Sequence, residues 1–235
     1  MRPLEKYNVI LASQSPRRLE ILQNHGTNPI VIPTETDECY NPTYDISSIV
    51  QQLSTRKAEA CLNILKEKIN ELSDLLAPKK PLLIIAADTL VYKGTSIMGK
   101  PKDASDAFRM LSTIRGDVHH VITGVCLIVA SISPANTSPD ALSPVITPSI
   151  IKDYQICFAE VTEVYCKKYS DKDIHNYIET EQPYDKAGAY AIQGSFKEYI
   201  DHISGDYENV VGLPYNRLIS EIEELQLQQT KKERN

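Results

Sequence analysis

Residues 9–18 read Val-Ile-Leu-Ala-Ser-Gln-Ser-Pro-Arg-Arg, an apolar strand that leads through two serines into a proline and two arginines. Ser15 can cap a helix, and Pro16 suits its first turn because no backbone donor is lost there. The free N–H groups at the start of such a helix attract anions. Arg17 and Arg18 add two cations whose fork geometry fits phosphate oxygens. The segment therefore predicts a cradle for a phosphate, sulfate or carboxylate group.

Asp88 follows a fully apolar run at residues 82–87. This run predicts a buried central strand with Asp88 and Thr89 at its C-terminal end, the edge where ligands collect in open α/β sheets. A carboxylate placed there can bind a divalent cation or take the proton from an attacking water. The alternative is that Asp88 caps a helix or forms a turn. The apolar run alone does not favour either the catalytic or the structural interpretation. The arginine cradle upstream favours the catalytic interpretation.

Lysines and a second carboxylate follow in residues 99–103, Gly-Lys-Pro-Lys-Asp. Gly99 and Pro101 constrain the backbone around Lys100, which suits a phosphate partner; an ordinary exposed turn is the alternative. Asp103 can cap the next helix and also act as an acidic site residue. Lys57 lies in a helical segment, where a solvated helix face is the commoner explanation.

Small residues dominate the segment 185–194, Asp-Lys-Ala-Gly-Ala-Tyr-Ala-Ile-Gln-Gly. They let the backbone approach a ligand, while Lys186 supplies charge and Gln193 an amide that can read a base edge. Tight packing is the alternative. A Walker A sequence and a G-x-G-x-x-G fingerprint are both absent from the sequence, so neither of these loops can account for nucleotide binding.

Strand-like and helix-like segments alternate in the first half of the chain, which predicts an α/β fold. Residues 1–229 are expected to form a single domain, with a Pro- and Ser-rich surface loop at 131–149 and a frayed tail at 230–235. Strands are predicted at 7–12, 29–33, 82–87, 118–130 and 154–168, and helices at 16–25, 47–75, 104–115, 170–180 and 214–228.

The net charge of −6 argues against general nucleic-acid binding through a basic face. No hydrophobic run reaches transmembrane length, so no membrane partner is expected. Five cysteines without a C-x-x-C pair fit reduced thiols in the cytoplasm, and the same features are compatible with the nucleus.

Seven spaced blocks of the sequence together resemble the Maf family. They lie at residues 11–18, 86–89, 99–103, 116–124, 185–190, 192–194 and 209–214, in the family's order. Members of this family are nucleoside triphosphate pyrophosphatases, which hydrolyse the bond between the α and β phosphates and release a nucleoside monophosphate and pyrophosphate. The resemblance implies a mixed twisted sheet with flanking helices and two lobes around a cleft, similar to the inosine triphosphatases. It also implies a homodimer.

The resemblance assigns roles to particular residues. Asp88 matches the proton acceptor. Positions around the phosphates are matched by Ser13, Arg17, Arg18, Lys57, Lys100 and Lys186, and acidic positions associated with the metal by Glu38, Asp88 and Asp103. Arg17, Thr89 and Gln193 resemble the type that acts on dTTP and UTP rather than the type that acts on 7-methyl-GTP.

The leading hypothesis is a pyrophosphatase in which Mg²⁺, or alternatively Mn²⁺, binds triphosphate oxygens while Asp88 deprotonates the attacking water. Modified pyrimidine nucleotides are further candidate substrates. The alternative is a nucleotide-binding regulator of cell division that acts through a protein partner. The intact set of Asp88, Lys100 and Lys186 favours the enzyme, because a pure binding protein has less need of a metal-directed carboxylate.

Overall fold

The computed structural model describes residues 3–72, 76–77, 79–133, 149–180 and 183–233. These residues form one seven-stranded mixed sheet with the order β2-β1-β3-β5-β6-β7, and β4 pairs with β3 off this path. Strand β1 pairs in parallel with β2 and β3, whereas the remaining neighbours are antiparallel. This arrangement confirms the predicted mixed α/β fold. No helix in the described part of the chain is long and apolar enough to cross a membrane.

The strands are β1 (Asn8–Leu11), β2 (Ile30–Val31), β3 (Leu82–Lys93), β4 (Ser96–Met98), β5 (Val118–Ser133), β6 (Ser149–Cys166) and β7 (Ile200–Ser204). The α-helices are α1 (Pro16–Asn24), α2 (Ile46–Leu72), α3 (Ala104–Ile114), α4 (Asp171–Ile178), α5 (Tyr207–Val211) and α6 (Tyr215–Glu233). Short 3₁₀ helices lie at η1 (Pro3–Lys6), η3 (Ala187–Ala189) and η4 (Ser195–Tyr199).

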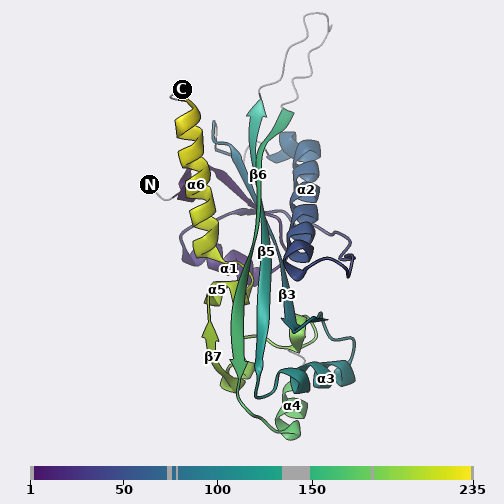
Figure 1. The fold of residues 1–235 in the computed structure, drawn as a ribbon. Coiled ribbons are helices and arrows are strands. Elements are labelled where there is room, and N and C mark those ends of the chain that lie inside the picture. The colour runs from purple at the N-terminus through teal and green to yellow at the C-terminus, as the bar shows by residue number, and fades with distance from the viewer. Residues whose placement is uncertain (1–2, 73–75, 78, 134–148, 181–182, 234–235) are drawn as a thin grey trace, which may run out of the picture.

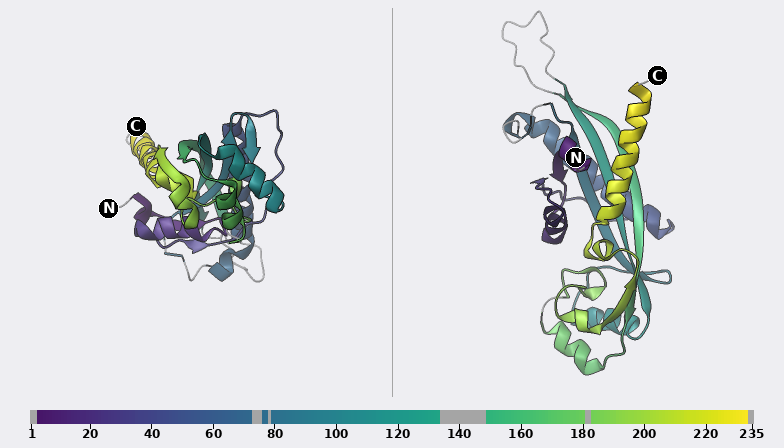
Figure 2. Two further views of the ribbon diagram at one scale, coloured as in Figure 1. Left: turned by 90° about the horizontal axis from the view of Figure 1, so that it is seen from below. Right: turned by 90° about the vertical axis from the view of Figure 1, so that its left-hand side faces the viewer.

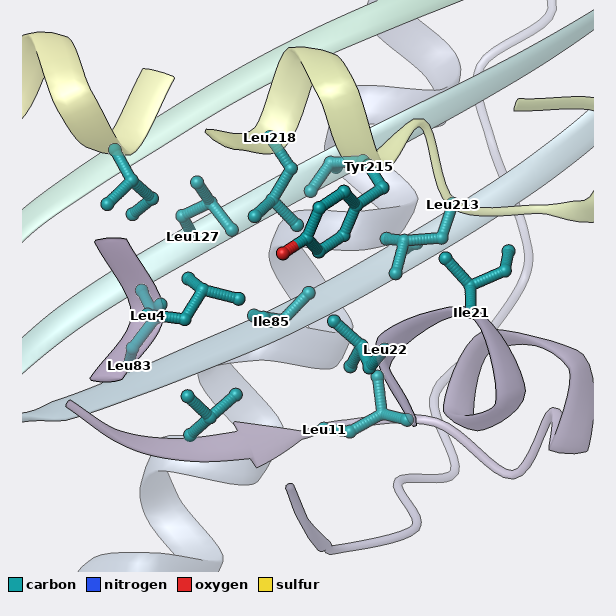
Figure 3. Close-up of a cluster of buried hydrophobic side chains, with 14 of the residues drawn as sticks. Leu4, Leu11, Ile21, Leu22, Leu83, Ile85, Leu127, Leu213, Tyr215 and Leu218 are labelled. Carbon is teal, nitrogen blue, oxygen red and sulfur yellow. The ribbon is translucent and has the colours of Figure 1, made fainter. Parts of the chain in front are cut away.

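Two hydrophobic clusters cover opposite faces of the first half of the sheet. Because side chains alternate along a strand, Leu83 and Ile85 of β3 face one cluster, while Leu82 and Ile84 face the other. Helices α1 and α6 close the first cluster, which Figure 3 shows in close-up, and α2 closes the second. We call this part of the molecule the α2 lobe.

A third cluster lies at the other end of the long strands β3, β5 and β6. It is formed mainly by α3, α4, η3 and η4, and we call this part the α3 lobe. Figure 1 shows β5 and β6 running through both lobes, with α2 and α6 beside their upper half and α3 and α4 at their lower end. The right-hand view in Figure 2 shows the same division of an elongated molecule. The expected pair of lobes is therefore present.

Strand β3 differs from its prediction in a way that matters for the site. It does not end at Ala87 but continues to Lys93, because Asp88 and Thr89 pair with Gly124 and Thr123 of β5 and the strand then turns back into β4. Strand β1 ends at Leu11, opposite Ile85. The prediction that Asp88 stands at the end of its strand was wrong: it lies within β3, just beyond the end of the neighbouring parallel strand.

The boundaries of other helices and strands also differ from the predictions. Strands β5 and β6 extend into the predicted loop 131–149, whose residues 134–148 lie outside the described part, as do 73–75 of the predicted helix 47–75. Helix α6 continues to Glu233 and so includes residues 230–233 of the expected frayed tail, and 234–235 are not described. The predicted N-cap at Asp103 is confirmed, since its side chain accepts a hydrogen bond from a backbone N–H in the first turn, and Ser170 caps α4 in the same way.

Candidate active site

The anion cradle lies where β1 leads into α1. Ser13 Oγ accepts hydrogen bonds from the backbone N–H of Ser15 and from Arg18 Nη1, both at 3.1 Å. Ser15 is the N-cap residue of α1, but its side chain makes no capping hydrogen bond. The prediction that the Ser15 side chain caps this helix was therefore wrong. Ser13 organises the turn instead, because its hydroxyl bonds to the backbone ahead of the helix.

Arg18 is held by three segments of the protein. Its Nε donates to the carbonyl of Gly212 at 2.8 Å, Nη1 to Ser13 Oγ, and Nη2 to Thr89 Oγ1 at 3.1 Å. Burial lowers the pKa of the guanidinium below its ordinary value, against the opposing effect of the nearby Asp88. Arg17 lies beside it and lines the cavity described below. The two arginines thus differ in how far the protein itself uses their donors.

Asp88 and Lys57 form an ion pair at the base of the site. Both side chains are largely buried, with exposed fractions of 10% and 15%, and they come from β3 and α2. Glu38 Oε1 lies 3.9 Å from the same ammonium, and its side chain is 65% exposed. Lys57 is therefore placed between two carboxylates and is not on a solvated helix face.

Gly124 allows α2 to bring Lys57 this close. It lies opposite Asp88 in the β3–β5 ladder. A Cβ atom at Gly124 would lie 2.4 Å from both the carbonyl carbon and the carbonyl oxygen of Val50 in α2. Only a glycine lets the helix backbone approach the strand here, because any side chain would meet the backbone of Val50.

A cavity of about 440 Å³ opens above the Lys57–Asp88 pair. Its wall combines residues of the α2 lobe, such as Leu53, with residues of the α3 lobe, such as Ile97 and Ala187. The cations that line it are Arg17, Arg18, Lys57, Lys100 and Lys186, and the carboxylates are Glu38, Asp88 and Asp185. The predicted cleft between the lobes is thus a strongly charged cavity.

A backbone contact brings Lys100 and Lys186 to the same wall. The N–H of Gly188 donates to the carbonyl of Gly99 at 3.0 Å, which joins the segments 99–103 and 185–194. Gly188 has φ of 71° and lies against Val91, and an added Cβ would come within 2.8 Å of the Val91 side chain. Lys186 also pairs with the neighbouring Asp185. These two segments, far apart in the sequence, therefore form one charged surface.

Three predicted site residues lie outside the cavity lining. Asp103 is exposed and accepts a hydrogen bond from the backbone N–H of Asp106 at 2.8 Å, so it serves as the cap of α3. Gln193 is exposed and follows Ile192, which does line the cavity. Ser13 is also absent from the lining but reaches the site through Arg18. The structure thus places the remaining predicted residues together: Arg17, Arg18, Glu38, Lys57, Asp88, Thr89, Lys100 and Lys186.

The expected metal ligands Glu38, Asp88 and Asp103 are not gathered into one group. Among the described residues there is no cluster of three or more His, Cys, Asp or Glu side chains placed to share a metal ion. Mg²⁺ commonly binds through one or two carboxylates together with substrate phosphates and water. Asp88 and Glu38, on either side of Lys57, fit that requirement, whereas Asp103 does not.

Several residues of the site carry no signal of their own in the sequence. Tyr40 lines the cavity from the loop that also carries Glu38, and Tyr190 lines it from the α3 lobe. Thr123 holds Thr89 by a 2.9 Å contact between their hydroxyl oxygens. The buried His119 lies 2.6 Å from the hydroxyl of Tyr190 through Nε2. His119 therefore supports Tyr190, which is part of the site.

Many known proteins are similar in sequence to this chain. A family model described as "Maf-like protein" matches residues 8–225. A protein of Alkaliphilus metalliredigens is 40% identical over 89% of this chain and 92% of its own length. Proteins of Caldicellulosiruptor bescii and Agathobacter rectalis are 39% and 38% identical over 89% and 92% of this chain, and 90% and 97% of their own lengths. All three are named dTTP/UTP pyrophosphatase.

Proposed function

The chain belongs to the Maf family, and we propose that it hydrolyses dTTP and UTP to the nucleoside monophosphate and pyrophosphate. The observation that carries this proposal is a single cavity in which the Lys57–Asp88 pair faces the cations Arg17, Lys100 and Lys186. A triphosphate brings several negative charges, and a cavity with five cationic side chains matches that ligand. The relatives named dTTP/UTP pyrophosphatase support the choice of substrate.

Asp88 is the group best placed to start the reaction. Its carboxylate accepts the proton of a water molecule as the water oxygen bonds to the α-phosphorus. The bond from that phosphorus to the oxygen bridging to the β-phosphate breaks, and pyrophosphate leaves. Lys57 holds the Asp88 carboxylate in one orientation through their ion pair.

The remaining cations act on the leaving group. Arg17, Lys100 and Lys186 line the cavity and neutralise the charge that develops on pyrophosphate as it departs. Mg²⁺, or alternatively Mn²⁺, held by Asp88 and Glu38 would further neutralise the triphosphate oxygens. Five of the eight charged side chains that line the cavity are cationic, so binding energy is concentrated on the phosphates.

Base selection is assigned to Arg17, Thr89 and Gln193. Arg18 and Thr123 fix the Thr89 hydroxyl from two sides, so this group presents a defined orientation at the cavity wall. Gln193 is next to the lining residue Ile192. Because the Gln193 side chain is exposed and outside the lining, its amide would have to turn toward the cavity to reach a base. Modified pyrimidine nucleotides remain within the proposed substrate class.

The test is release of pyrophosphate from dTTP and UTP in the presence of Mg²⁺, with GTP and 7-methyl-GTP as comparison substrates. We expect Asp88→Asn to lower the rate by at least about a thousandfold, because the proton acceptor is lost, while nucleotide binding stays near that of the unmodified protein. Asp117→Asn is the matched control, since Asp117 also pairs with a lysine, Lys93, but lies outside the cavity. No pyrophosphate from either substrate, from a folded protein, would refute the proposal.

We also propose a cytoplasmic location and a homodimeric assembly. All five cysteines are free thiols, which fits a reducing compartment. The homodimer follows from the family resemblance, and analytical ultracentrifugation would test it. The acidic net charge of −6 supports a small-molecule substrate over nucleic acid.

A further inference from the structure

Two cysteines lie directly opposite each other on neighbouring strands, outside the cavity lining. Cys126 of β5 and Cys157 of β6 are register partners in the antiparallel ladder, and both are free thiols. Opposite residues in such a pair have Cα atoms about 4.5–5.5 Å apart and side chains on the same face. A disulfide needs Cα atoms about 4.4–6.8 Å apart. The ladder therefore holds this pair at a separation that a disulfide can span.

The two thiols have different surroundings. Cys126 is fully buried, whereas Cys157 is partly exposed. Thr55 Oγ1 of α2 lies 3.2 Å from Cys157 Sγ, and Gln155 Nε2 donates to the same sulfur at 3.4 Å. The Gln155 amide stabilises negative charge on Cys157, which is also the sulfur that solvent can reach.

The pKa values follow from these contacts. The hydrogen bond between the two thiols lowers the pKa of Cys157 to about 6 and raises that of Cys126. The nearby ammonium of Lys152 further lowers the pKa of Cys157. A lowered pKa increases the thiolate fraction of Cys157, and the thiolate is the form that attacks oxidants and disulfides.

The other cysteines lack this combination of access and charge. Cys39 is the exposed cysteine, but its hydrogen bond with Asp37 raises the pKa of its thiol. Cys61 and Cys166 are buried, and burial raises the pKa of each to about 12. The exposed cysteine, Cys39, is therefore not the cysteine whose pKa is lowered, Cys157. An experiment can thus distinguish reactivity that follows exposure from reactivity that follows the thiolate.

We propose that Cys157 and Cys126 form a reversible dithiol–disulfide pair, in which Cys157 attacks a hydroperoxide and Cys126 resolves the product. The Cys157 thiolate takes one oxygen of hydrogen peroxide, giving a sulfenic acid and releasing hydroxide. The Cys126 thiol then attacks that sulfur, forming the S–S bond and releasing water. In total, two thiols lose two hydrogen atoms, and one peroxide is reduced to two waters.

The experiment treats the reduced, full-length protein with hydrogen peroxide, alkylates the remaining thiols at intervals and maps the peptides by mass spectrometry. We expect Cys157 to be lost at least about tenfold faster than Cys39, because reactivity follows the thiolate. The product should be a peptide pair joined through Cys126 and Cys157, reversed by dithiothreitol. The readout is independent of nucleotide hydrolysis, so it stands apart from the proposed enzymatic activity.

Variants identify the role of each sulfur. Cys157→Ser should abolish the bridge, and Cys126→Ala should leave a sulfenic acid on Cys157 that dimedone traps. Cys39→Ser is the matched control and should leave the bridge unchanged. Faster modification of Cys39 than of Cys157 in the unsubstituted protein would overturn the proposal, as would oxidation of Cys157 without a bridge to Cys126. Both of these outcomes are read without any variant, so a folding defect in Cys126→Ala cannot obscure them.

Discussion

Arg18 donates hydrogen bonds to three segments that are far apart in the chain, at Ser13, Thr89 and Gly212. It therefore fixes the cradle, the central strand and the turn before α6 relative to one another. The sequence predicts both Arg17 and Arg18 around the phosphates and also associates Arg17 with the choice of base. The structure gives Arg18 a positioning role as well, whereas the Arg17 side chain lines the cavity and is available to the substrate.

Lysine substitution should separate these roles. Arg18→Lys keeps the charge, but an ammonium group cannot donate to all three acceptors of the guanidinium in their present positions. Because buried acceptors then lose their donors, we expect the free energy of unfolding to fall by about 2–3 kcal/mol and kcat to fall with it. Arg17→Lys should leave the free energy of unfolding within about 0.5 kcal/mol and raise KM. Urea denaturation and steady-state kinetics on UTP measure both. Equal loss of stability in the two variants would contradict the distinction.

At the scale of elements, the contact between α2 and β5 at Gly124 positions the catalytic pair. Gly124→Ala places a methyl group against the backbone of Val50, and overpacking of this kind costs about 1–3 kcal/mol. Because α2 must move away, Lys57 should separate from Asp88, and we expect turnover to fall at least about tenfold. Thermal unfolding and pyrophosphate release measure these effects.

Gly99→Ala provides the control for this substitution. Gly99 is also next to the site, but an added Cβ there would meet nothing within 4 Å. Its stability should therefore change by less than about 0.5 kcal/mol. A Gly124→Ala protein as stable and active as Gly99→Ala would show that the helix does not depend on this close approach.

The buried contact between His119 of β5 and Tyr190 makes the free energy of unfolding depend on pH. Burial lowers the pKa of His119 from 6.5 to about 3 in the folded protein. Below pH 6.5 the unfolded chain therefore binds a proton that the folded chain does not. The stability contributed by the neutral imidazole is complete above pH 6.5 and is lost progressively as the pH falls toward 3.

His119→Gln should remove this dependence, since glutamine does not titrate. We expect the stability advantage of the histidine form over His119→Gln to shrink by about 2 kcal/mol between pH 7 and pH 5. Urea denaturation at a series of pH values measures the difference in free energy of unfolding between the two proteins. The carboxylates are common to both, so their titration cancels in this difference. A constant difference across this range would contradict the prediction.

Helices were easier to predict than strands because their signals are local. The helices predicted at 47–75, 104–115 and 170–180 match α2, α3 and α4 to within a few residues. The continuation of β3 past Asp88 depends on pairing with β5 and β4, residues that are distant in the sequence. Polar residues such as Asp88 and Thr89 look like a strand end unless that pairing is known.

At the scale of the whole molecule, the cavity lies where two hydrophobic clusters meet. Ile192 and Val211 belong to the α2-lobe cluster on the α1 and α6 face, and Val91 and Tyr190 belong to the α3-lobe cluster. The motifs predicted most of the charged wall because charge and glycine spacing are visible in the sequence. They could not predict Tyr40, which lies outside every motif, or the roles of Tyr190 and Thr123, which arise from packing.

A ligand that spans this cavity should stabilise both lobes as one unit. We expect UTP with Mg²⁺ to stabilise Asp88→Asn, which retains binding but does not hydrolyse the ligand, by about 2.7 kcal/mol at a concentration of 100 times Kd. Unfolding should remain a single transition, because β5 and β6 run through both lobes (Figure 1). Tripolyphosphate is the control: it supplies the charge without the base, so a smaller shift at equal concentration measures the contribution of the base contacts. A UTP-induced shift confined to one of two separate transitions in differential scanning calorimetry would contradict a binding site shared between the lobes.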